Sequence, residues 1–128
     1  MARISDAEWV LLDLLWKYGE LTITQMVNLL AETKGWSKHA IISFLNKMES
    51  KNLVCCHQEG RAKHYSAAIE REETVISESV SFIDKVFHGK LGLMVSNLVE
   101  NDKLKDEEID ELLRILEERK GINPEDKE

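Results

Sequence analysis

The sequence has little of what marks a secreted or membrane-spanning protein. Only two of its 128 residues are cysteines, and no apolar run approaches the ~20 residues that a membrane-spanning helix needs. Cys55 and Cys56 are adjacent, and because neighbouring Cα atoms lie about 3.8 Å apart, closer than disulfides usually allow, we expect reduced thiols. Residues 1–4 lack the apolar core of a signal peptide. These absences predict a cytoplasmic protein.

Recognisable catalytic and metal-binding motifs are missing as well. The sequence has no G-x-S-x-G, Walker loop or H-E-x-x-H, so we expect neither an enzyme nor a bound cofactor. Cys55, Cys56, His57 and His64 lie on or near a predicted hairpin, but alternation puts Cys55 and His57 on one face and Cys56 on the other. Paired-Cys zinc spacing is also absent. We therefore expect no metal site and interpret the cysteines as buried structural thiols.

Charge is distributed unevenly along the chain. The net charge of −7 by itself argues against a nucleic-acid partner. Residues 1–69, however, carry 8 basic and 7 acidic side chains, whereas residues 70–128 carry 9 and 17. Between Lys34 and Lys63 there are 6 basic and 2 acidic residues, a local net of +4. Because charges further away than about 10 Å are largely screened at ordinary salt, this segment can still bind phosphates.

Two helices are predicted before residue 36. Ser5 and Glu8 fit a capping box at the start of the first helix, and Gly19 is placed to end it. A second capping box begins at Thr22, and we expect Gly35 to end the helix that follows. A third helix follows directly, so the last two suit a helix-turn-helix.

The third predicted helix, Ser37–Lys51, is the candidate recognition helix. Its apolar stripe has the spacing of an amphipathic helix and consists of Ile41, Phe44, Leu45 and Met48. The opposite face is polar with few carboxylates, and it offers amide, imidazole and hydroxyl groups that can read base edges. The residues expected to face bases are His39, Ile42, Ser43 and Asn46. For this stretch alone, an ordinary solvated helix face is the alternative.

A β-hairpin is predicted after these helices. Strands at 53–58 and 62–67 flank Glu59-Gly60-Arg61, where glycine suits a turn with positive φ. Three helices followed by a hairpin predict a winged helix-turn-helix DNA-binding domain over residues 1–69. The residues expected to hold DNA phosphates are Ser37, Lys38, Lys47, Arg61 and Lys63. For Arg61 and Lys63, a solvated turn is the alternative.

The rest of the chain is predicted to be helical and to form a dimer. Helices are expected at 70–88, 91–100 and 106–120, followed by a frayed tail at 121–128 that contains the only proline. These helices carry more apolar surface than a lone appendage can hide, so we expect residues 70–120 to pair with a second copy rather than pack back on the same chain. The expected interface residues are Ile76, Val80, Ile83, Phe87, Leu91, Met94, Val95, Leu98, Ile109, Leu112, Leu113 and Leu116. The predicted fold is mainly α with a small β-hairpin: a winged helix-turn-helix plus a C-terminal helical dimerisation region.

Several short segments together resemble the penicillinase-repressor family. They are Ile4–Trp9 with Leu15-Trp16, Gly35-Trp36-Ser37, and Glu59-Gly60-Arg61-Ala62 ahead of Tyr65-Ser66. The resemblance runs from about residue 4 to residue 120, and the family includes β-lactamase, methicillin-resistance and copper-responsive repressors. It implies a homodimeric winged-helix repressor on a palindromic operator.

The resemblance also implies a means of release from DNA. In the β-lactam branch, a membrane sensor metalloprotease governs proteolysis in the dimerisation region. The family's scissile Asn-Phe bond would match Asn97-Leu98 here, with leucine in place of phenylalanine. The copper branch carries C-terminal Cys-x-Cys motifs, and none occurs after Cys56, which disfavours copper sensing of that kind.

A dimeric transcriptional repressor is the leading hypothesis. The candidate recognition helix departs from the family's common residues, with His39 and Ile42 at positions where the family has Lys and Ala40 where it has Thr. Fewer cations predict a shallower salt dependence. One alternative is a winged helix that binds a protein partner through its acidic helices instead of DNA. Another is a thiol- or metal-sensing repressor that uses Cys55 and Cys56.

Overall fold

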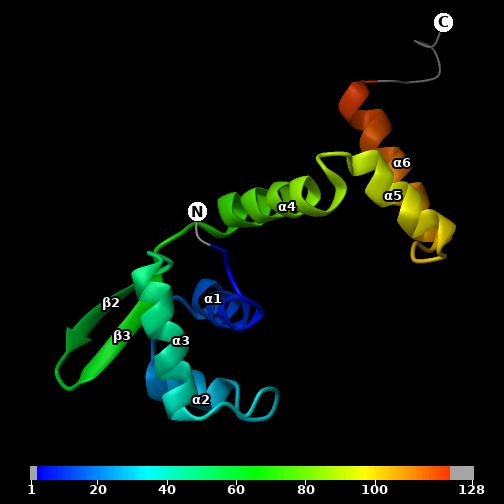
Figure 1. Cartoon of the computed structure of the whole chain (residues 1–128). Coiled ribbons are helices and arrows are strands. Elements are labelled where there is room, and N and C mark those ends of the chain that lie inside the picture. The colour runs from blue at the N-terminus through cyan, green and yellow to red at the C-terminus, as the bar shows by residue number, and fades with distance from the viewer. Residues whose placement is uncertain (1–2, 122–128) are drawn as a thin grey trace, which may run out of the picture. The chain divides into compact units, whose positions relative to one another are not determined.

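The computed structural model describes residues 3–121 (Figure 1). The elements in chain order are α1 (Asp6–Tyr18), β1 (Leu21–Thr22), α2 (Ile23–Leu29), α3 (Lys38–Ser50), β2 (Val54–Glu59), β3 (Ala62–Ala67), α4 (Arg71–Phe87), α5 (Leu91–Glu100) and α6 (Asp106–Lys120). The chain forms two compact units, of which the first ends at Ser77 and the second begins at Glu78. The predicted boundary after residue 69 falls just before α4 and stays a prediction. The predicted frayed tail lies, except for Gly121, outside the described residues.

Reciprocal capping boxes begin α1 and α2. The Ser5 hydroxyl accepts a hydrogen bond from the Glu8 backbone N–H, and the Glu8 carboxylate accepts one from the Ser5 N–H. Thr22 and Gln25 make the same pair of bonds at the start of α2. Each box satisfies two N–H groups that the first turn of a helix leaves without intrahelical partners. Both predicted helix starts, and the end of α1 at Gly19, are therefore confirmed.

The end of α2 differs from the prediction. We expected this helix to continue to Gly35, but it ends at Leu29. The Ala31 N–H reaches only the Asn28 carbonyl, at 3.4 Å, so the i→i−4 ladder is interrupted there. The Leu30 carbonyl then accepts the Gly35 N–H at 2.8 Å, which closes a separate turn. Gly35 has a φ of +60°, a conformation that costs glycine little, and it ends this turn instead of the helix.

The strands form one antiparallel sheet in the order β1-β3-β2. The hairpin of β2 and β3 was predicted. The strand β1 was not, because it has only two residues and the second, Thr22, is also the N-cap of α2. In the central strand, Tyr65 pairs with Leu21 of β1 on one side and Cys56 of β2 on the other. Gly60, with a φ of +64°, lies in the two-residue connection between the hairpin strands. A helix-turn-helix followed by this hairpin is a winged helix, as predicted.

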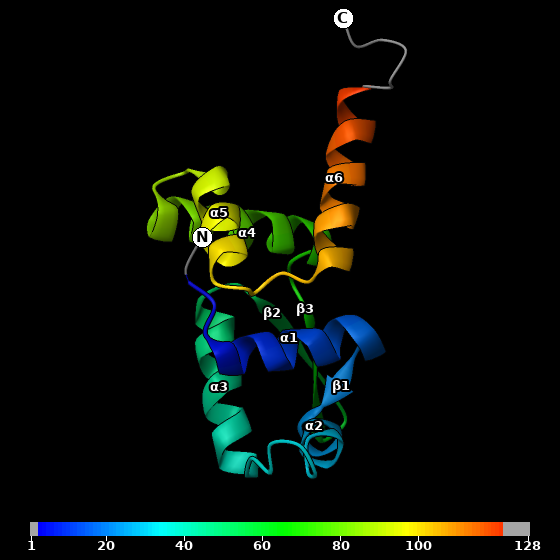
Figure 2. The ribbon, with the colours of Figure 1, turned by 90° about the vertical axis from the view of Figure 1, so that its right-hand side faces the viewer.

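The first unit holds the hydrophobic core. Figure 2 shows α1 crossing the C-terminal half of α3, with α2 near the start of α3. The buried apolar residues are Ile4, Leu11, Leu12, Leu15, Leu21, Met26, Leu30, Ile41, Leu45, Met48, Leu53, Val54 and Tyr65. Trp16 packs at the edge of this core, and its indole Nε1 donates a hydrogen bond to the Ile69 carbonyl at 3.0 Å. That bond fixes the chain where it leaves the sheet.

The second unit contrasts with the first, because no residue of α5 or α6 is buried within the chain. Their large exposed apolar side chains are Leu91, Leu93, Val99, Leu112, Leu113, Ile115 and Leu116. Three acidic residues, Asp106, Glu107 and Glu108, occupy the first turn of α6, where the helix dipole favours negative charge. Among the described helices, none has the length and apolar character needed to cross a bilayer.

Candidate nucleic-acid interface

Helix α3 is held with one face in the core and the opposite face in solvent. Ser37 caps it, and its hydroxyl accepts a hydrogen bond from the Ala40 N–H at 3.1 Å. Ile41, Leu45 and Met48 are fully buried on the inner face, as the apolar stripe predicted. Packing of that stripe against α1 and α2 fixes the rotation of α3 about its own axis. The outward face is therefore set by the core.

The residues predicted to face bases all remain accessible. His39, Ser43 and Asn46 are exposed, and Ile42 is half-buried. Ile42 and Asn46 line a groove of about 550 Å³ between α3 and the hairpin, whereas His39 and Ser43 lie outside its lining. The structure thus places two of the four predicted base-facing residues in the lining of one groove.

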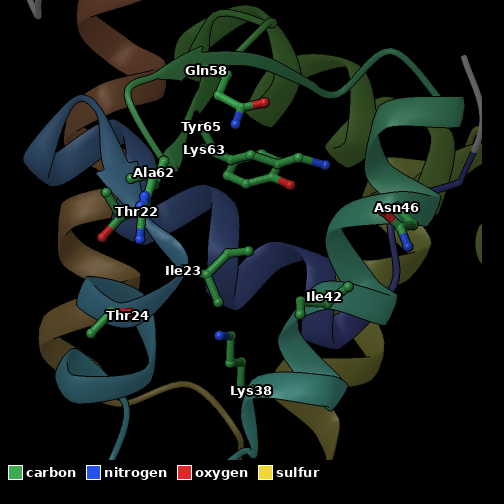
Figure 3. A pocket seen from close by; sticks show the side chains of 11 residues that line it. Thr22, Ile23, Thr24, Lys38, Ile42, Asn46, Gln58, Ala62, Lys63 and Tyr65 are labelled. Atoms are coloured by element: carbon green, nitrogen blue, oxygen red, sulfur yellow. The ribbon is translucent and has the colours of Figure 1, made fainter.

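The groove opens between α3 and the inner face of the hairpin (Figure 3). Ile42 and Asn46 project from α3 on one side, and Gln58 and Lys63 lie on the hairpin opposite. Thr22 and its neighbours from the start of α2 complete the lining. Amide, hydroxyl and apolar groups side by side are the kinds of side chain that contact base edges.

Cations surround this groove. Lys38, Arg61 and Lys63 are exposed and line it, and none of the lining residues in the described part of the chain is acidic. Like charges gathered around a concave surface focus a positive potential there, which attracts polyanions. Lys47 is exposed on α3 but lies outside the lining. Ser37 is exposed as well, although its oxygen already accepts the capping bond.

Six residues that line the groove were not predicted as site residues: Thr22, Ile23, Thr24, Gln58, Ala62 and Tyr65. Tyr65 is buried at its floor, and burial, with the nearby Cys56 thiol and Glu49 carboxylate, raises the pKa of Tyr65 to about 12. Its hydroxyl is therefore harder to ionise than that of an exposed tyrosine. The pairing of Gln58 with Lys63 across the hairpin could have identified Gln58, because directly paired residues share a face.

The cysteines and histidines of the hairpin depart from the expectation drawn from the sequence. Cys55 is exposed and Cys56 half-buried, so Cys55 is not a buried structural thiol. His57 and His64 pair directly across the hairpin and their rings stack. Alternation along one strand did not predict this pair, because it ignores the register with the next strand.

The predicted dimer residues lie on accessible surface of the single chain. Among the twelve, the exposed ones are Ile76, Val80, Leu91, Leu112, Leu113 and Leu116, and the half-buried ones are Ile83, Phe87, Met94, Val95, Leu98 and Ile109. Asn97 and Leu98 of the candidate cleavage site lie inside α5. The Asn97 carbonyl there accepts hydrogen bonds from the backbone and side-chain N–H groups of Asn101, at 3.2 and 2.8 Å.

Comparison with known families matches almost the whole chain. The model of the family described as "Penicillinase repressor" matches residues 4–118. A penicillinase repressor of Bacillus licheniformis is 35% identical over 119 residues, which cover 93% of each chain. The methicillin resistance regulatory protein MecI of Staphylococcus aureus strain N315 is 26% identical over 91% of this chain and 95% of its own length.

The first unit also has a counterpart among solved structures. The solution structure of the DNA-binding domain of the repressor BlaI is 28% identical, with a TM-score of 0.50. The match covers 57% of this chain and 93% of that domain. The winged helix described above is thus the fold of a domain known to bind DNA.

Proposed function

Because the chain belongs to the penicillinase repressor family, we propose that this transcriptional repressor binds a palindromic operator as a homodimer. Each copy would place α3 in a major groove, with Asn46 and Ile42 toward base edges and the hairpin beside the adjacent backbone. His39 and Ser43 would face bases further along the helix. The phosphate contacts would come from Ser37, Lys38, Lys47, Arg61 and Lys63. Such a protein acts where the chromosome lies, in the cytoplasm.

The observation that carries this proposal is the groove between α3 and the hairpin. Ile42 and Asn46, the candidates for base contacts, line it together with the cations Lys38, Arg61 and Lys63. None of its described lining residues is acidic. The chain as a whole has a net charge of −7, so this groove differs in charge from the protein that carries it. A local positive patch on an acidic protein is the footprint expected of a reader of nucleic acid.

The homodimer is supported by the apolar surface of α5 and α6. Seven large apolar side chains of these two helices are exposed in the single chain, and neither helix has a buried residue. Exposed apolar area of this kind marks an interaction surface. A second copy supplies the same apolar surface in return. It also supplies a second winged helix, which a palindromic site requires.

We further propose that cleavage at Asn97-Leu98 by a membrane sensor protease, in a β-lactam-type response, releases the repressor. The cut would remove α6 from the chain that carries the winged helix and thereby weaken the dimer. A single winged helix loses the avidity of two linked sites. For many bivalent binders this lowers the overall affinity by a factor of about 10² or more. Since proteases bind extended chain, α5 must open locally before it can be cut.

Fluorescence anisotropy with the DNA upstream of the protein's own gene tests the repressor proposal. Four cations per chain predict about eight phosphate contacts per dimer, so affinity should fall by about 10⁴-fold between about 50 and about 200 mM salt. A duplex of the same composition in shuffled order serves as the control. Half of the palindrome should bind far more weakly than the whole.

Two results would contradict the proposal. Equal affinity for operator and shuffled duplex would show that the protein does not recognise a DNA sequence. Equal affinity for the whole and half operator would show that binding does not use two winged helices. If neither DNA binds, the winged helix serves a protein partner instead, and the acidic helices become the surface to test.

A further inference from the structure

The outer face of the hairpin carries a second cluster of polar side chains, apart from the groove. In an antiparallel pair, directly opposed residues project to the same face, and neighbours along a strand alternate. Cys56 and Tyr65 therefore share the inner face, where Tyr65 lines the groove. His57 and His64 share the outer face, and their rings stack with centroids 5.3 Å apart and planes 19° from parallel.

Two carboxylates lie next to this imidazole pair. The two oxygens of Glu20 lie 3.4 Å from Nδ1 of His57 and 3.3 Å from Nδ1 of His64. Oε2 of Glu59 lies 3.9 Å from Nε2 of each histidine. Glu20 precedes β1, Glu59 ends β2 and His64 is in β3, so the sheet brings together residues from three strands or their ends.

Each ring has a carboxylate near both of its nitrogens. A neutral imidazole keeps a lone pair on one nitrogen, and that nitrogen can bind a metal ion. A cation between this nitrogen and the neighbouring carboxylates would attract both kinds of ligand.

We propose that Glu20, Glu59 and His64 form a binding site for one zinc ion, with His57 beside it. Glu20, Glu59 and His64 each offer a ligand atom, and these three atoms all lie within 4.8 Å of one another. His57 stacks on His64 and lies next to the same two carboxylates, so it can help to hold them in place. Imidazole nitrogen favours zinc and its transition-metal neighbours over magnesium and calcium, which prefer oxygen alone.

A tetrahedral zinc ion would draw the three ligand atoms together through side-chain movements, with water as its fourth ligand. Zinc lies about 2.0–2.2 Å from nitrogen and oxygen ligands, which places neighbouring ligand atoms about 3.4 Å apart. The three candidate ligand atoms lie further apart than this in places, but all within 4.8 Å of one another. Glu20, His57 and Glu59 are exposed, so rotation of their side chains can close the remainder without moving the sheet.

An ion at this site would act on the hairpin without occupying the groove. It would tie the residue before β1 to the far end of β2 through β3, on the face opposite Tyr65 and Cys56. A ligand that binds the folded protein alone stabilises the fold in proportion to its affinity. The site would therefore stiffen the hairpin while leaving Ile42 and Asn46 open.

Titration of the full-length protein with zinc chloride, followed by calorimetry, tests the site in the absence of DNA. We expect one ion per chain, and the ring signals of His57 and His64 should shift in NMR spectra. His57→Gln and His64→Gln should each weaken zinc binding by about tenfold or more, since loss of an outer partner of a metal ligand already costs that much. Zinc should raise the melting temperature of the wild-type protein. It should leave unchanged the melting temperature of a variant that carries both His57→Gln and His64→Gln.

The chain's other two histidines provide matched controls. His39→Gln changes α3, and His88→Asn keeps a residue that tolerates the positive φ of 53° at that position. Both should bind zinc as the wild type does, and circular dichroism without metal should show that all variants fold. Unchanged zinc affinity in His57→Gln and His64→Gln would overturn the proposal. It would also be overturned if binding were lost in Cys55→Ser and retained in His64→Gln, because the thiol would then hold the ion.

Discussion

Nζ of Lys51 lies 2.7 Å from Oε1 and 3.0 Å from Oε2 of Glu8, which joins the end of α3 to the start of α1. The same ammonium donates to the Arg3 carbonyl at 2.9 Å. Glu8 is only 2% exposed, and its carboxylate also caps α1 through the Ser5 N–H. One buried carboxylate thus fixes both the start of α1 and the position of α3 against it.

Lys51→Met should destabilise the first unit. Removal of one partner leaves the Glu8 carboxylate buried without its countercharge, and breaking a buried pair in this way costs about 3 kcal/mol. Urea unfolding should show this loss at neutral pH. Lys47→Met, which removes an exposed lysine from the same helix, should change the free energy of unfolding by no more than about 0.5 kcal/mol. Equal effects of the two substitutions would mean that the pair contributes nothing.

Stability should also depend on the protonation of Glu8. Burial by itself raises the pKa of Glu8, but the Lys51 and Ser5 hydrogen bonds and the Lys51 charge outweigh it, so the pKa is lowered below 4.5. A lowered pKa in the folded state stabilises the fold above the unfolded value, and this stabilisation is lost as pH falls through the folded pKa. The wild type should therefore be more stable than Glu8→Gln at neutral pH, and the difference should shrink below pH 4.5. A difference that stays constant into acid would contradict this linkage.

Asn46→Ala and Lys47→Ala should affect DNA binding in different ways. An asparagine that pairs with a base edge contributes about 1–3 kcal/mol of discrimination, so Asn46→Ala should weaken operator binding and relax preference at one position. Lys47→Ala should weaken operator and shuffled duplex alike and lower the salt slope by about one for each phosphate left without its lysine. Anisotropy with both duplexes distinguishes the two patterns. If Asn46→Ala weakens both duplexes equally, Asn46 does not read bases.

Local signals made most of the fold predictable from the sequence. The capping boxes at Ser5 and Thr22 identify helix starts because they satisfy specific backbone groups within four residues. The period of Ile41, Leu45 and Met48 identifies the buried face of α3, which also fixes its outward face. These features depend only on neighbours along the chain, and so the sequence expresses them directly.

Features that depend on distant partners could not be predicted in this way. Glu8 looks like a surface acid until Lys51, 43 positions away, is placed beside it. The strand β1 forms only because Leu21 meets Tyr65, and Glu20 joins the histidine cluster for the same reason. Pairing and burial across such separations are tertiary properties that overrule local preference.

Leu116→Gln should weaken the proposed homodimer. Leu116 is 61% exposed in the single chain, and burial of a leucine at an interface contributes about 1.5–3 kcal/mol. Since the residue occurs once in each copy, the dimer dissociation constant should rise by more than about tenfold. Sedimentation equilibrium measures this constant directly. Glu117→Gln, the neighbouring exposed residue, is the control and should leave it nearly unchanged. Equal dissociation constants for the two variants would show that Leu116 does not lie in the interface.

Gly92→Ala should slow cleavage at Asn97-Leu98. Gly92 lies in the first turns of α5, and a Cβ there meets no atom within 4 Å, so alanine fits. Alanine in place of glycine stabilises a helix by about 0.5–1 kcal/mol, which lowers the population of locally opened α5 by about two- to fivefold. Where opening is fast, proteolysis follows that population, so the rate should fall by the same factor in a timed digest. Gly89→Ala is the contrasting variant, because its φ of +79° strains any side chain and should not protect the bond. Cleavage of Gly92→Ala at the wild-type rate would mean that the protease acts on α5 without opening it.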